Sequence, residues 1–164
     1  MRGNPSVWTE RPQAADGARP SHVRSVPDAA LDTDHALSAA ATFPFTLSDL
    51  GKLRRFVAAA AAGAALEQER CEDLVLAIDE LATNSICHGG GCGNLQIWRE
   101  RGELVCEVRD AGIIDEQIHG RPMPDPDAVC GRGLWLVEQL TDRVEVSSTP
   151  GAGSVVRVSM QLAA

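Results

Sequence analysis

The segment Glu80-Leu-Ala-Thr-Asn84-Ser-Ile-Cys-His88-Gly89 closes a long helical pattern and runs into two further glycines. Leu74, Ile78 and Leu81 recur at helical spacing, which predicts a helix over residues 67–87 that stops at the glycines. A helix places Glu80 and Asn84 on one face, one turn apart. A carboxylate and an amide beside an apolar stripe are costly unless something pairs with them. The two residues indicate either an exposed helix edge with an ordinary hydrogen-bonded pair or a binding site.

The hydrophobic pattern on both sides of this helix changes period. Leu50, Leu53 and Val57 predict a helix from a cap at Ser48 to about residue 62. Alternating residues over 95–98 and 104–109 predict a β-hairpin, residues 133–140 a third helix, and residues 144–146 and 156–160 two strands. This order predicts an α+β fold, a two-layer sandwich with helices on one face of a mixed, mostly antiparallel sheet.

Asp110 stands at the end of the second strand of the hairpin. It continues the alternation of Leu104, Cys106 and Val108, so its side chain is expected to point to the buried side of the sheet. Gly112 follows two residues later, where a missing side chain lets other atoms approach the backbone. An ordinary turn aspartate is the alternative, and the inward register favours a site.

Two glycine motifs follow. Gly131-Arg132-Gly133 opens the third predicted helix, where free backbone N–H groups and the helix dipole favour an anion such as phosphate. Gly153-Ser154 leads into the last strand. Taken singly, these motifs also fit a plain helix start and a plain turn. Residues 111–130, with three prolines, predict a long loop of the kind that often forms a functional lid.

In this order and spacing, the four features resemble the histidine-kinase-like ATPase superfamily, whose domain is called the Bergerat fold. Within it, the chain is most similar to the bacterial anti-sigma-factor serine/threonine kinases, over about Phe45 to Met160. Residues 80–89 resemble the N box of this family, and Asp110-Ala-Gly112 resembles its first glycine box. Residues 131–136 resemble the second glycine box, and Gly153-Ser154 the third.

The resemblance implies a role for each motif residue. Asn84 would coordinate a Mg²⁺ ion that bridges the phosphates of ATP, and Glu80 would be the general base. Asp110 would accept a hydrogen bond from the amino group of adenine, supported by the hydroxyl of Ser154. Gly112 would make room for the base.

The phosphate end is implied in the same way. Gly131 and Gly133 would line the phosphates within a lid from about Ile113 to Cys130, and His88 and Arg132 would lie within reach of them. The cofactors implied are therefore ATP and Mg²⁺. One departure is the short second glycine box, where Val129 stands in place of a glycine.

The family also implies a function. The leading hypothesis is a kinase that phosphorylates a serine or threonine of an anti-anti-sigma (STAS-type) partner and sequesters a sigma factor when that partner is absent. The protein is expected to be a homodimer. The alternative is a nucleotide-gated binding module that sequesters a partner without significant catalysis. A third hypothesis is ATP hydrolysis that drives a conformational cycle, as in gyrase-like relatives.

Composition limits the other classes of function. The net charge of −8 and a pI near 4.9 argue against direct nucleic-acid binding. No apolar run approaches the ~18 residues of a membrane span, and the start of the sequence does not resemble a secretory signal, so a cytoplasmic location is expected. Residues 1–42 are rich in proline and polar residues and predict a disordered tail, or a linker from a sensor domain. The ATP-binding domain is expected over residues 43–164.

The cysteines have two readings. There are five, at positions 71, 87, 92, 106 and 130, and the irregular spacing fits reduced thiols better than disulfides. Cys87, His88 and Cys92 suggest a zinc site, but no closely spaced cysteine pair anchors it. Small buried cysteines are the favoured interpretation.

Overall fold

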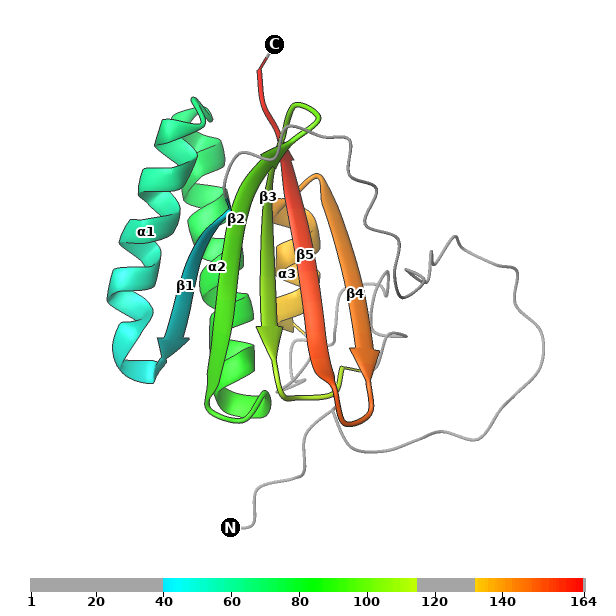
Figure 1. Cartoon of the computed structure of the whole chain (residues 1–164). Coiled ribbons are helices and arrows are strands. Elements are labelled where there is room, and N and C mark those ends of the chain that lie inside the picture. The colour runs from blue at the N-terminus through cyan, green and yellow to red at the C-terminus, as the bar shows by residue number, and fades with distance from the viewer. Residues whose placement is uncertain (1–39, 115–131, 164) are drawn as a thin grey trace, which may run out of the picture.

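The computed structural model describes residues 40–114 and 132–163 (Figure 1). Three helices and five strands occupy these ranges, with a short 3₁₀ turn before the first helix. Along the chain they are β1 (Ala41–Thr46), the turn η1 (Leu47–Asp49), α1 (Leu50–Gly63), α2 (Gln68–His88), β2 (Cys92–Glu100), β3 (Glu103–Asp110), α3 (Arg132–Leu140), β4 (Arg143–Thr149) and β5 (Gly153–Gln161).

The strands form one sheet in the order β1-β2-β3-β5-β4, and every neighbouring pair in the described sheet is antiparallel. The predicted mixed sheet is therefore wrong in this detail. The strands β3 and β4 do run in the same direction, but β5 inserts between them and pairs with both. No parallel pair is left in the described sheet, because the last strand of the chain fills the gap.

The sheet and the helices make two layers, as predicted. Figure 1 shows the helices on one side of the sheet, with α2 between α1 and α3. Alternate residues of the central strands face this helical layer; Ile97, Cys106 and Val158 lie side by side across β2, β3 and β5. The helices contribute the other half of the core through Leu53, Val57, Ala61, Leu74, Ile78, Leu81, Leu134 and Val137. This face-to-face burial confirms the α+β fold class.

The start of the domain differs from the expectation. The strand β1 begins at Ala41, two residues before the predicted boundary, and Phe45 in this strand is 1% exposed. Ser48 is not the helix cap. Instead Thr46 precedes the 3₁₀ turn, and its backbone N–H and hydroxyl both donate to the carboxylate of Asp49. The strand is short and contains a proline, so its pattern does not stand out from the preceding residues.

The expectation of buried cysteines holds for only one of those described. Cys106 is fully buried, and this burial raises the pKa of its thiol to about 12, which keeps it protonated. Cys71 is half-buried, whereas Cys87 and Cys92 are exposed because they flank the glycine turn between α2 and β2. All four are free thiols. Within the described ranges, no group of three acidic, histidine or cysteine side chains is arranged to hold a metal.

None of the helices in the described ranges is both long enough and apolar enough to cross a bilayer.

Candidate functional site

The carboxylate of Asp110 lies where the end of β3 meets the last turns of α2. Its Oδ1 accepts hydrogen bonds from the Ser154 hydroxyl at 2.6 Å and from the Gly112 backbone N–H at 2.8 Å. Its Oδ2 accepts one from the Ser85 hydroxyl at 2.6 Å. The side chain points to the helical layer, as the alternation in β3 predicts, and it is half-buried. A fixed, partly accessible acceptor is thus built from three elements of the fold.

Two glycines bring the backbone against this carboxylate. A Cβ atom on Gly89 would lie 2.5 Å from Cγ of Asp110, and one on Gly112 would lie 2.9 Å from the carbonyl oxygen of His88. The N–H of Ala111 donates to the Gly89 carbonyl at 3.0 Å, which ties the end of β3 to the end of α2. The absence of a side chain at Gly112 therefore lets the end of β3 pack closely against the backbone at the end of α2.

The second group of predicted residues lies further back along α2. Glu80 and Asn84 are both half-buried and face Gly133 in the first turn of α3. A Cβ atom on Gly133 would lie 3.1 Å from Oε2 of Glu80 and 3.1 Å from Nδ2 of Asn84. A carboxylate, an amide and a bare helix start therefore meet at one place. The helix edge is not simply exposed, which was the alternative interpretation.

Of the remaining predicted site residues, the structure describes some and not others. His88 is the last residue of α2 and Arg132 the first of α3, and both are exposed. Gly131 and residues 115–130 of the predicted lid lie outside the described residues. Ile114 at the start of that lid is 7% exposed and its N–H donates to the Ser148 hydroxyl at 3.0 Å, so it belongs to the core.

Two residues of this site were not predicted as site residues. Ser85 contacts Asp110 although the two residues are 25 positions apart in the sequence. Gly89 is predicted as the helix stop at the end of the segment that resembles the N box, and it also packs against the carboxylate of Asp110. The signal for Ser85 is its position directly after Asn84, on the part of the helix that faces the end of β3.

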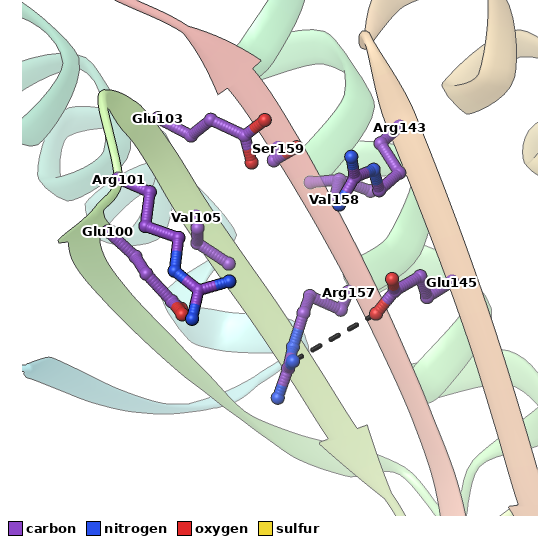
Figure 2. Close-up of a pocket in the computed structure, with 9 residues that line it drawn as sticks. All are labelled: Glu100, Arg101, Glu103, Val105, Arg143, Glu145, Arg157, Val158 and Ser159. Atoms are coloured by element: carbon purple, nitrogen blue, oxygen red, sulfur yellow. Dashed lines mark ion pairs between the residues drawn. The ribbon is translucent and has the colours of Figure 1, made fainter. Parts of the chain in front are cut away.

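A separate cavity of about 320 Å³ lies on the opposite face of the sheet (Figure 2). Charged side chains surround it; Arg157 and Glu145 approach to 3.9 Å, as the dashed line in the figure marks. Glu107 beside it is only 2% exposed and pairs with Arg109 and Arg157 at 2.7 Å each. The cavity contains none of the predicted site residues, so it is not the site described above.

Two glycines at the start of β5 and in the turn before it differ in how closely they approach Asp110. Gly153 has φ +93°, and a Cβ atom there would lie 2.0 Å from the backbone oxygen of Asp110. Gly151 has a similar φ of +82° but no atom within 4 Å of its Cβ position. We expect Gly153→Ala to lower the free energy of unfolding by about 2 to 5 kcal/mol, since it adds overpacking to backbone strain. Gly151→Ala should cost about 1 kcal/mol.

Chemical denaturation of the two variants and the wild type checks this expectation. Equal losses of stability in both variants would contradict the tight contact between Gly153 and Asp110.

The fold and the order of these groups define a class: a two-layer α+β domain with a carboxylate and an amide one turn apart on a helix and an aspartate at a strand end, as expected from the resemblance to the Bergerat fold. A family model described as "Histidine kinase-like ATPase domain" matches residues 43–160. The chain belongs to this family, which confirms the resemblance seen in the sequence.

Curated relatives carry the name "Anti-sigma F factor". The one from Clostridium acetobutylicum is 32% identical over 104 residues, which cover 58% of this chain and 73% of the relative. The one from Thermoanaerobacter sp. strain X514 is 30% identical over 115 residues, covering 65% of this chain and 80% of the relative. A third, from Pasteuria penetrans, is 29% identical over 108 residues, 58% of this chain and 71% of the relative.

Proposed function

We propose that this protein is an ATP-dependent serine/threonine kinase that acts as an anti-sigma regulator. The observation that carries the proposal is the convergence of Glu80 and Asn84 on the bare start of α3 at Gly133. Phosphoryl transfer depends mainly on positioning and on neutralising charge, and this arrangement offers a base, an oxygen ligand and helix N–H groups together. The relatives named anti-sigma F factor support the anti-sigma part of this proposal.

The site fits the Mg²⁺ ion that the family implies. Mg²⁺ takes oxygen ligands and few protein contacts, and the amide oxygen of Asn84 is such a ligand. The missing side chain at Gly133 leaves space where a Cβ atom would press on both Glu80 and Asn84. Bound Mg²⁺ would neutralise charge on the phosphates.

Side chains and glycines of the chain would bind the nucleotide and accept the proton during transfer. Asp110, supported by Ser154, would hold the amino group of adenine, and Gly112 would leave room for the base. The phosphates would lie towards Gly131 and Gly133, within reach of His88 and Arg132. Glu80 would accept the proton of the acceptor hydroxyl. The oxygen of that hydroxyl would bond to the γ-phosphorus, and the bond between the γ-phosphorus and ADP would break.

The partners belong to the same proposal. The acceptor is a serine or threonine of an anti-anti-sigma (STAS-type) protein, and the protein sequestered is a sigma factor. We further propose a cytoplasmic homodimer without direct contact to nucleic acid. The acidic balance of the chain supports the last point.

The test is to incubate the full chain with Mg²⁺, γ-labelled ATP and candidate STAS-type proteins. Label on a serine or threonine of the partner is the expected result. Label found only as free phosphate would favour the hydrolytic cycle. Partner binding that depends on nucleotide, with no label released or transferred, would favour the sequestering module and contradict the kinase.

A further inference from the structure

Ser85 is a buried hydroxyl next to the proposed adenine acceptor. It is 1% exposed and lies on α2 directly after Asn84. Its Oγ lies 2.6 Å from Oδ2 of Asp110 and 3.1 Å from the backbone oxygen of Leu81. A hydroxyl has one proton to donate, and the shorter contact to a charged acceptor is the stronger one. Ser85 therefore donates to Asp110.

The acceptor positions of the Asp110 carboxylate can then be counted. A carboxylate accepts at about four positions, two on each oxygen. The two on Oδ1 are filled by the Ser154 hydroxyl and the Gly112 N–H, and Ser85 fills one on Oδ2. In the described part of the chain, one acceptor position on Oδ2 remains for a ligand.

The donors around the carboxylate are equally informative. Ser85, Ser154 and the N–H of Gly112 each direct their hydrogen at Asp110. None of these three is left to donate to a carbonyl oxygen on a base. A 6-oxopurine would place its O6 against a carboxylate oxygen, where both atoms are acceptors.

We propose that Ser85 is a positioning residue that fixes Oδ2 of Asp110 so that it accepts a 6-amino group and rejects a 6-oxo group. Ser85 thereby sets the preference for adenine over hypoxanthine or guanine bases. This inference rests on the proposed nucleotide-binding function. Sites built around a hydrogen bond to an N–H of the substrate discriminate strongly, because an analogue without it leaves buried groups unpaired.

A purely structural role for Ser85 would be its bond to the helix carbonyl of Leu81. Thr141 offers a matched control, because its buried hydroxyl donates to the Val137 carbonyl at 2.8 Å after the end of α3. Thr141→Val removes that hydroxyl at nearly constant shape. We expect this variant to have a lower thermal stability than wild type but the same ratio of ADP to IDP affinity.

The experiment is calorimetric titration of the full chain with Mg·ADP and Mg·IDP, the latter carrying O6 in place of the amino group. Wild type should prefer ADP. We expect Ser85→Ala to reduce the ratio of the two affinities by about tenfold, through weaker ADP binding, because an unpaired Oδ2 is free to reorient. Ser85→Cys keeps the volume with a weaker donor and should fall between.

The outcomes separate the two proposals. One outcome is that wild type binds ADP, but the ratio of ADP to IDP affinity in Ser85→Ala stays within about twofold of the wild-type ratio. In that case the role of Ser85 is overturned while the proposed function stands. If Ser85→Ala does not fold, the ratio in Ser85→Cys decides in the same way. If wild type binds neither nucleotide, the proposed function fails, and this inference fails with it.

Discussion

Replacing Glu80 with glutamine is expected to leave Mg·ATP binding near the wild-type level and to slow phosphoryl transfer by about 10²- to 10⁴-fold, the usual contribution of a positioned general base. Glutamine keeps the length of the side chain, so its packing against Gly133 is retained. What is lost is the ability to accept the proton of the attacking hydroxyl. The change should appear in the rate of transfer and not in nucleotide affinity.

Single-turnover transfer of labelled phosphate to the partner protein measures this effect. Glu69→Gln is the matched control, because Glu69 is an exposed carboxylate in the first turn of the same helix. Asn84→Ala provides the contrast: it should weaken Mg²⁺-dependent nucleotide binding as well as transfer. Wild-type transfer rates in Glu80→Gln would contradict its role as the base.

Replacing Asp110 with asparagine is expected to weaken ADP binding by about 1 to 3 kcal/mol, the range for disrupting a charged hydrogen bond. The amide oxygen should take the place of Oδ1, where Ser154 and Gly112 both donate. The NH₂ group then replaces Oδ2 and faces the amino group of adenine, so that two donors meet. Ser85 can turn its hydroxyl to the Leu81 carbonyl and accept from the new amide.

Because the protein contacts can rearrange in this way, the variant should fold. Calorimetry with Mg·ADP, together with a denaturation curve, separates loss of affinity from loss of structure. An unchanged affinity in a folded Asp110→Asn protein would remove the assignment of Asp110 to adenine.

The parts of the site that were predicted from the sequence depend on local periodicity. Helical spacing alone places Glu80 and Asn84 on one face, and strand alternation alone turns Asp110 towards the helices. The structure has both, with α2 and β3 within a residue or two of their predicted ranges.

The parts that were missed depend on how the elements pack. The strand β5 lies between β3 and β4, although it follows both in the sequence. The order of the strands along the chain does not reveal which strands become neighbours, so the fully antiparallel arrangement was not predicted. Ser85 was missed for the same reason, since its role needs the end of β3 to lie against α2. Cys87 and Cys92 were expected to be buried, but exposure at a turn is decided by what packs over it.

The most direct test of the proposed adenine-nucleotide site is a calorimetric titration of ADP into the full chain, with Mg²⁺ and again with excess EDTA. We expect saturable binding at one site per chain, and weaker binding when the metal is removed, because Asn84 and the phosphates would both be ligands of the ion. GDP should bind much more weakly under the same conditions. No saturable binding of Mg·ADP, or equal affinity for GDP, would contradict an adenine-nucleotide site built on Asp110 and Asn84.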